Sequence, residues 1–357
     1  MENPYQATGD INLKLSPITA SSEEIILTPK SGQFLDRTQV EQVITNHFDK
    51  MRRINNVKSF KVNEDATIEV TFNKDGQTQE QILKFTANGF YSFCRAFRGS
   101  NQRCLTTQFQ MNTLLGAQAI TNFAMQRIKN DRLDLLLYDN DRIEGVVTPD
   151  YAHFPTLSLL QQIYLTQEHY LPTSLHIQGL KSRTTFLTEL SSHQFEVRPG
   201  DVLSLGRDLI NSEDGGRAFD FGIYIYRARS RSGTVAPNNI FKRKIVHRGA
   251  ASFDKAMSTL TMESTEVKAF FDVISQATEI RLTEETLEKA LDHIQRKTNK
   301  GFRESVNIEY NHSDLEGPGS NLYDLWLATI RVASEQPNQE IRRNQERMSW
   351  DLLSIKL

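Results

Sequence analysis

The sequence predicts an α+β fold, in which a mixed, largely antiparallel sheet with interspersed helices is followed by a helical C-terminal region. Apolar and polar residues alternate at a period of two in residues 57–85 and again in 174–248, which indicates strands. After residue 250 the apolar residues recur at helical spacing instead. The 357-residue chain is 38% hydrophobic and 24% charged, a composition typical of folded globular proteins.

Residues 1–22 are polar and irregular, so we expect a flexible arm. The first helix begins after Asp36, whose side chain can cap it, and its apolar positions are Val40, Val43, Ile44, Phe48 and Met51. Three strands at 57–62, 67–72 and 80–85 follow as a meander. The residues Lys74-Asp75-Gly76 tolerate a positive φ and predict the turn before the third strand.

Helices are predicted at 90–97 and 111–128. Strands at 134–138 and 142–147 flank the turn residues 139–141, and a short helix at 156–165 follows. Strands then continue from 174 through 202 to 248, with breaks at 199–200 and 211–216. The helical C-terminal region, 251–357, contains helices at 267–276, 283–298, 322–333 and 339–353, the second of which begins at Thr283 ahead of two carboxylates. Residues 23–250 form the α+β core.

Positive charge is concentrated in two segments. Residues 81–130 contain six basic and no acidic residues, residues 221–250 contain seven and none, and residues 131–220 contain seven basic and fourteen acidic residues, although the whole chain carries only −2. Such segregation is typical of a binding site for a polyanion such as nucleic acid. The alternative is that acids from elsewhere in the chain pack against these cations in the fold.

The strand at 219–231 carries the more specific signal. Its odd-numbered residues run from apolar side chains into a row of arginines spaced about 6.6 Å apart, twice the rise of a strand, which suits the phosphates of an extended nucleic acid strand. After an expected loop at 232–239, a second strand presents further cations, and tyrosines on the first strand can stack on bases. The predicted binding residues are Arg227, Arg229, Arg231, Lys242, Arg243, Lys244, Arg248, Tyr224 and Tyr226. Protection of a sheet edge by charged residues is the competing explanation.

A second basic group surrounds the polar loop at 99–101. Arg95, Arg98 and Arg103 there, with the nearby aromatic residues Phe90, Tyr91, Phe93 and Phe97 as stacking surfaces, extend the predicted nucleic-acid site. An ordinary surface loop explains the same composition.

No catalytic motif is present. The patterns GxxxxGK[ST], GxGxxG, HExxH and GxSxG are all missing, so we expect no enzyme activity and no cofactor. Asp139, Asp141, Glu144 and Asp150 form the best carboxylate cluster for magnesium, but a solvated hairpin turn explains it better, and we predict no metal site. Cys94 and Cys104 are expected to be reduced structural thiols.

Several stretches resemble the phage- and plasmid-borne proteins of domain-of-unknown-function family 932. They are LLLYDNDRIEGVVTPDYAHFP (135–155), RPGDVLSLGRDLINSEDGGRAF (198–219), YIYRARSRSGTV (224–235), His247-Arg248-Gly249, NLYDLWLATIRVAS (321–334) and FTANGFYSFCRAF (85–97). The family's setting implies handling of mobile DNA. Its usual Cys-containing segment R-x-x-C-x-N-G is replaced here by residues 227–233. The order of helix, meander and helix is also similar to ring-forming single-strand annealing proteins, an analogy of fold alone.

We therefore expect a non-enzymatic protein that binds single-stranded DNA and promotes annealing without ATP, as a homo-oligomer. The alternatives are an interaction protein of a mobile element that binds an acidic partner, and a magnesium-dependent nuclease. The N-terminus lacks the features of a signal peptide and no apolar run is long enough to cross a membrane, so we expect a cytoplasmic protein. Apolar faces of the two last helices are expected to be buried, either within the chain or between subunits.

Overall fold

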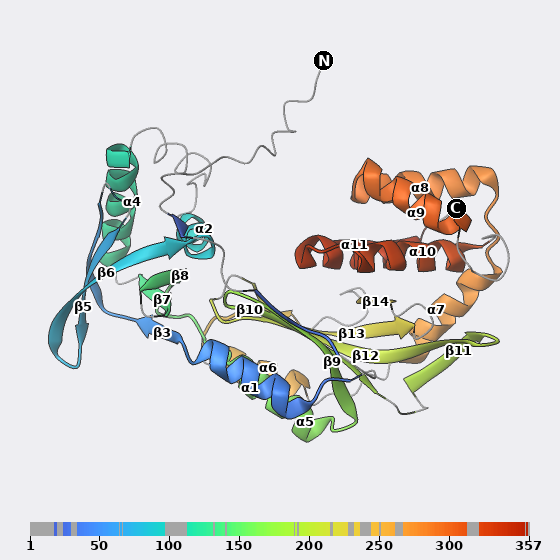
Figure 1. The fold of residues 1–357 in the computed structure, drawn as a ribbon, viewed down its shortest axis with the longest axis horizontal. Helices are drawn as coiled ribbons and strands as arrows, with labels where there is room; N and C mark the ends of the chain where they lie inside the picture. Colours follow the sequence, from blue (N-terminus) through green and yellow to red (C-terminus); the bar gives the residue numbers. More distant parts are fainter. Residues whose placement is uncertain are drawn as a thin grey trace, which may run out of the picture.

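The computed structural model describes residues 18–19, 24–29, 34–63, 65, 67–96, 113–130, 133–139, 141–188, 190, 193–214, 217–227, 232–235, 244–249, 251–260, 267–312, 321–353 and 355. It confirms the α+β class: two largely antiparallel sheets are joined by helices, and the C-terminal part is helical (Figure 1).

The first sheet forms an N-terminal lobe (Figure 1). Its strand order is β3-β7-β8-β6-β5-β4, with β1 beside β6, and only the β1–β6 and β6–β8 pairs are parallel. Helices α2 (Ala87–Ala96) and α4 (Thr113–Ile128) pack against it around Phe60, Phe85 and Phe93. The strands are β1 (Ile18–Thr19), β3 (Met51–Ile54), β4 (Val57–Val62), β5 (Ile68–Lys74), β6 (Gln77–Thr86), β7 (Asp134–Tyr138) and β8 (Arg142–Val147).

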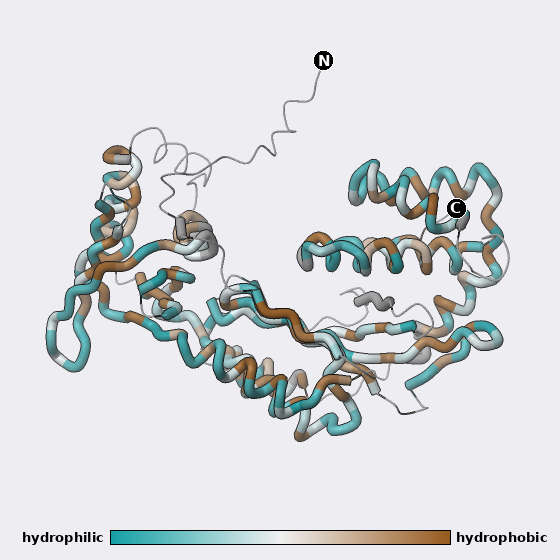
Figure 2. Tube along the Cα trace, viewed as in Figure 1, coloured by the Kyte–Doolittle hydropathy of each residue, from teal (hydrophilic) through white to brown (hydrophobic). Residues whose placement is uncertain are grey.

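The predicted meander is confirmed as β4, β5 and β6. Its β5–β6 turn lies where the sequence places it, with Asp75 and Gly76 at φ 52° and 80°, backbone angles in the left-handed region that glycine adopts without strain. The hairpin tip is hydrophilic in Figure 2, consistent with the exposed side chains at 73–80.

The second sheet is antiparallel throughout, in the order β14-β13-β12-β10-β9-β2, with β11 beside β12 and β15 beside β13. β14 and β15 pair with successive stretches of β13, on the side away from β12. The expected loop at 232–239 is thus wrong for its first four residues, which form β14. The strands are β2 (Glu24–Leu27), β9 (Tyr170–Gln178), β10 (Lys181–Thr188), β11 (Gln194–Arg198), β12 (Asp201–Ser212), β13 (Phe219–Arg227), β14 (Ser232–Val235) and β15 (Lys244–Ile245).

Helices lie on both sides of the second sheet (Figure 1). On one side are α1 (Arg37–Phe48), α5 (Thr156–Thr166) and α6 (Ala251–Leu260), and α1 is capped as expected by Asp36, whose Oδ1 accepts the Gln39 N–H at 2.8 Å. The remaining helices, α7 (Val267–Glu279), α8 (Glu284–Lys297), α9 (Lys300–His312), α10 (Leu322–Ser334) and α11 (Gln339–Leu353), form the C-terminal region. Helices α6 and α9 were not predicted.

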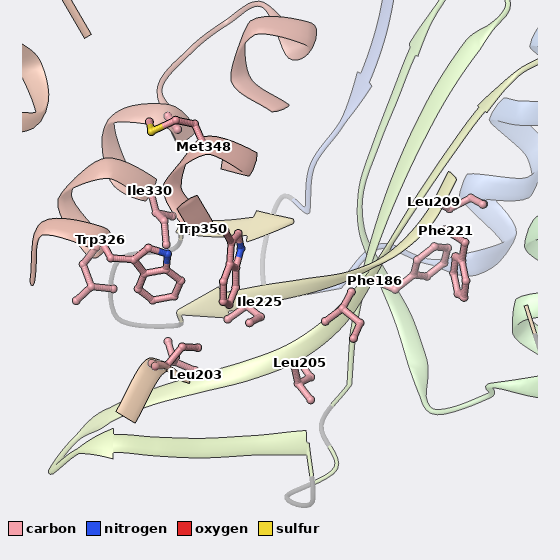
Figure 3. Packing of buried hydrophobic residues seen from close by; sticks show 14 of the residues in the cluster. Phe186, Leu203, Leu205, Leu209, Phe221, Ile225, Trp326, Ile330, Met348 and Trp350 are labelled. Atoms are coloured by element: carbon pink, nitrogen blue, oxygen red, sulfur yellow. The ribbon is translucent and has the colours of Figure 1, made fainter. Parts of the chain in front are cut away.

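Most apolar side chains of α10 and α11 are buried within the chain, with Ile341 of α11 an exposed exception. Trp326 and Trp350 lie edge to face, with ring centroids 5.4 Å apart, and pack in one core with Leu203 and Ile225 of the sheet (Figure 3). The intrachain alternative is therefore the one observed for these faces.

Buried ion pairs join α11 to the second sheet. Glu346, with a fully buried side chain, accepts from Arg183 at 2.9 Å, and Arg183 donates from Nε to Asp208 at 2.7 Å. One helical turn away, Arg343 donates to Asp220 at 2.7 Å. Because each of these carboxylates is removed from water, each needs its cation to remain charged in the interior.

We predict that Glu346→Ala lowers the free energy of unfolding by about 3–5 kcal/mol, because it leaves Arg183 buried beside too little negative charge. The matched control is Glu304→Ala on α9, whose exposed pair with Lys300 contributes at most about 1 kcal/mol. Urea unfolding at neutral pH measures both variants. Equal, small losses would contradict the assigned role of the buried pairs.

Candidate nucleic-acid interface

Arg227 is not exposed, which corrects the expectation from strand alternation. It does share the odd-numbered face of β13 with Phe219, Phe221, Ile223 and Ile225, but that whole face is buried. Its Nε donates to Asp201 Oδ1 at 2.5 Å, and the Tyr323 hydroxyl donates to the other oxygen of Asp201 at 2.9 Å. Arg227 is therefore the counter-ion of a buried carboxylate from the acidic segment, and it is not available to a phosphate.

Tyr224 also fails as a base-stacking residue. It is only 6% exposed beneath α11, and burial, followed by the charge of Glu346, raises its pKa to about 12. Tyr226, two residues on, is half-buried and packs against the small cluster formed by Leu187 and Tyr224. On the N-terminal lobe, Phe90 and Phe93 are fully buried core residues rather than stacking surfaces.

Two predicted cations are exposed. Lys244 begins β15, and Arg248 reaches solvent while its Nε donates to Asp150 at 3.0 Å in an exposed pair. The side chain of Arg95, on α2, lies outside the described residues, and so do Arg98, Arg103, Arg229, Arg231, Lys242 and Arg243. Residues 228–249 carry six basic residues and no acidic one, and we call them the basic segment.

Many acidic residues of the acidic segment, 131–220, lie in the interior of the fold. Half of its fourteen carboxylates are buried, namely Asp134, Glu144, Asp201, Asp208, Glu213, Asp214 and Asp220. Across the described residues, nine carboxylates and four guanidiniums are buried, a difference of five negative charges. Since the whole chain carries −2, the rest of the chain carries +3.

Three segments distant in the sequence meet beside the basic segment. Glu213, which follows β12, accepts the Thr156 N–H on Oε1 and pairs with His153 Nε2 on Oε2, both at 2.7 Å. The Tyr151 hydroxyl donates to the Glu213 carbonyl at 2.6 Å, and Asn211 Nδ2 donates to the Phe154 carbonyl at 2.6 Å. We call these residues, together with His247, the junction cluster.

His247 closes the junction cluster from the end of the basic segment. Its ring stacks on Phe154, with centroids 4.0 Å apart, and on Tyr151 at 5.7 Å. His247 Nδ1 lies 3.1 Å from the Ala152 carbonyl, so the neutral ring carries its proton there. Burial lowers the pKa of His247 to about 4, against its Ala152 hydrogen bond and the charge of Asp214, which act to raise it. This ring stacking holds the C-terminal end of the basic segment against Phe154 and Tyr151.

Sequence reasoning did not identify the junction cluster. Apart from Thr156, its parts come from three of the stretches that carry the family resemblance, at 135–155, 198–219 and 247–249. These stretches are far apart in the sequence, and no residue spacing indicates that they lie close together in the fold. The cluster could therefore not be predicted from the sequence.

Strands β7 and β8, which flank Asp139 and Asp141 of the predicted carboxylate cluster, pair antiparallel. Asp139 has φ 52° and pairs with Arg142, and Glu144 is buried. Within the described ranges, no group of three or more His, Cys, Asp or Glu side chains is arranged to hold a metal ion. Cys94 is buried and its pKa is raised to about 12 by that burial, as expected of a structural thiol.

No family model, no curated protein and no solved structure matches this chain. The resemblance to domain-of-unknown-function family 932 stays a prediction. Among the helices that the structure describes, none has both the length and the apolar character needed to span a bilayer.

The pKa of His247 predicts a pH-dependent stability. Between pH 4 and 6.5 the unfolded chain binds a proton at this residue and the native chain does not, so the free energy of unfolding rises with pH across this window, by about 3 kcal/mol. His247→Phe keeps an aromatic ring in the stack and should flatten that rise. Urea unfolding at pH 4.5, 5.5 and 6.5 tests it, and an unchanged slope in the variant would rule out His247 as its source.

Proposed function

We propose that this protein binds single-stranded DNA through the basic segment, 228–249, and promotes annealing of complementary strands without ATP. Two strands within the segment, β14 and β15, lie on the edge of the second sheet, where both pair with β13. Five of the residues predicted from sequence, Arg229, Arg231, Lys242, Arg243 and Lys244, remain in the proposal with Arg248. Arg227 and Tyr224 do not.

The observation that supports this proposal most is that the nearby carboxylates are already paired. Asp201 holds Arg227, Asp208 holds Arg183, and Asp220 holds Arg343 and Arg347. All three lie on β12 or β13, the strands next to the basic segment, and all are buried. These three acids are therefore engaged by arginines from outside the basic segment, whereas Arg248 of the segment pairs with the exposed Asp150.

The net charge of the residues outside the buried set also favours binding to nucleic acid. The buried residues leave a net +3 for the rest of the chain, which attracts polyanions. Binding would draw its free energy from release of counterions by neutralised phosphates, so it would weaken as salt rises. A segment of this length spans few nucleotides, and we propose that homo-oligomers present several copies to one strand.

The test replaces Arg229, Arg231, Lys242 and Arg243 by Gln together and keeps Arg227, which the fold needs. We predict about tenfold or more weaker binding of a single-stranded oligonucleotide, with a salt dependence whose slope falls by about 0.7 for each phosphate that the variant no longer neutralises. A gel shift over a salt series measures both quantities. Annealing of complementary oligonucleotides without ATP should slow in parallel.

The matched control replaces four exposed cations elsewhere, Lys58, Lys74, Arg281 and Lys297, by Gln. It removes the same charge and should leave binding nearly unchanged. Equal loss in both variants would show that net charge alone, and not the basic segment, attracts the nucleic acid. A wild-type protein that binds no oligonucleotide but binds an acidic polypeptide such as polyglutamate would replace the proposal by the interaction-protein alternative.

A further inference from the structure

The turn at 148–152 is contacted by two parts of the molecule, the N-terminal lobe and the basic segment. It directly follows β8, the last strand of that lobe, and the Tyr151 N–H closes it by donating to the Thr148 carbonyl at 2.9 Å. Arg53 of β3 reaches the turn from the lobe, and residues 247–249 of the basic segment reach it as well. The turn therefore connects the lobe physically to the end of the basic segment.

The guanidinium of Arg53 joins the lobe to the turn. Its Nη2 and Nε both donate to Oδ2 of Asp134, on β7, at 2.6 and 3.0 Å. The same group donates to three carbonyls of the turn, those of Thr148 at 3.3 Å, Pro149 at 3.4 Å and Tyr151 at 3.4 Å. Because a guanidinium has five donors in a fixed plane, one side chain holds all of these acceptors, and the buried Asp134 carboxylate orients it.

The basic segment binds the same turn through its C-terminal end. The Gly249 N–H donates to the Asp150 carbonyl at 2.8 Å, and the Ala152 N–H donates to the His247 carbonyl at 3.4 Å. The His247 ring also stacks on Tyr151. Since the two hydrogen bonds join backbone groups, they depend on where the backbone of the turn lies.

We propose that Arg53 is a positioning residue that couples the N-terminal lobe to the basic segment. By fixing the turn at 148–152, Arg53 fixes where the C-terminal end of the segment lies. This inference rests on the proposed function, because the segment is the proposed site for single-stranded DNA. Arg53 contacts no phosphate in this scheme. A segment held in place loses less conformational freedom when it binds, so its affinity for the strand is higher.

Two single variants test the coupling by binding, Arg53→Gln and Asp134→Asn. They change the net charge in opposite directions, so an effect of charge alone would weaken binding in the first and strengthen it in the second. The coupling predicts that both bind a thymidine oligonucleotide several-fold more weakly than the wild type. The slope of log K against log salt should stay the same, because no phosphate contact is lost.

The matched control is Arg52→Gln. Arg52 is the neighbour of Arg53 on β3, and it donates to Gln81 of β6 within the lobe. The control removes the same charge as Arg53→Gln and should bind like the wild type. If Arg53→Gln unfolds, Asp134→Asn decides, because the Arg53 side chain that it releases is 31% exposed and can be hydrated.

Hydrogen–deuterium exchange of the free protein tests the same coupling without DNA. Exchange at 148–152 and 246–249 should be faster in Arg53→Gln and Asp134→Asn than in the wild type and the control, with the central strands of the second sheet unchanged. A general loss of stability would instead speed exchange throughout the chain, and that result would overturn a specific positioning role.

The outcomes separate this inference from the proposed function. Unchanged exchange at 246–249 in both variants overturns the coupling, and the proposed function stands if the wild type binds the oligonucleotide. Faster exchange there with unchanged binding overturns the positioning role alone. A salt slope that falls by about 0.7 in Arg53→Gln would show that Arg53 itself contacts a phosphate, which also overturns it. A wild type that binds no oligonucleotide refutes the proposed function and any role of Arg53 in binding, and faster exchange in the variants then supports the coupling of lobe and segment alone.

Discussion

The pairing of buried carboxylates on β12 and β13 with arginines from elsewhere in the chain is the constraint on which the rest of this structure depends. Asp201, Asp208 and Asp220 are each almost fully buried, and none remains charged in the interior without a cation. Two of them take that cation from β10 or α11, which fixes the C-terminal helix over the sheet. The third takes Arg227 from β13 itself. The position of α11 and the burial of Tyr224 follow from these pairs.

The same pairing explains why the distribution of charge along the sequence does not predict which charged residues are buried in the fold. The acidic segment 131–220 places half of its carboxylates in the interior, where they neutralise arginines. The residues outside this buried set carry +3 in total, although the formal charge of the whole chain is −2. Counting acidic and basic residues segment by segment correctly indicated that the basic segment contains no acidic residue. The count did not distinguish Arg227, which is a buried counter-ion, from Lys244, which is exposed to solvent.

Local patterns predicted the secondary structure well. The cap at Asp36, the turn at Gly76 and the strands β7 and β8 were all predicted from residues that interact with near neighbours in the sequence. Helix α9 was missed although Phe302, Val306 and Tyr310 repeat at a spacing of four and are buried in the core, so the signal was present. The environment of Arg227 was not predictable in this way, because Asp201 lies 26 residues earlier and only the pairing of β12 with β13 brings them together. The junction cluster escaped prediction for the same reason.

Hydrogen–deuterium exchange with and without a single-stranded thymidine oligonucleotide tests the central claim most directly, since it asks both whether the chain binds the strand and where. The account predicts slower exchange over residues 228–249, with the N-terminal meander of β4, β5 and β6 unchanged. Protection confined to the N-terminal lobe, or no protection at an oligonucleotide concentration that saturates a gel shift, would contradict it.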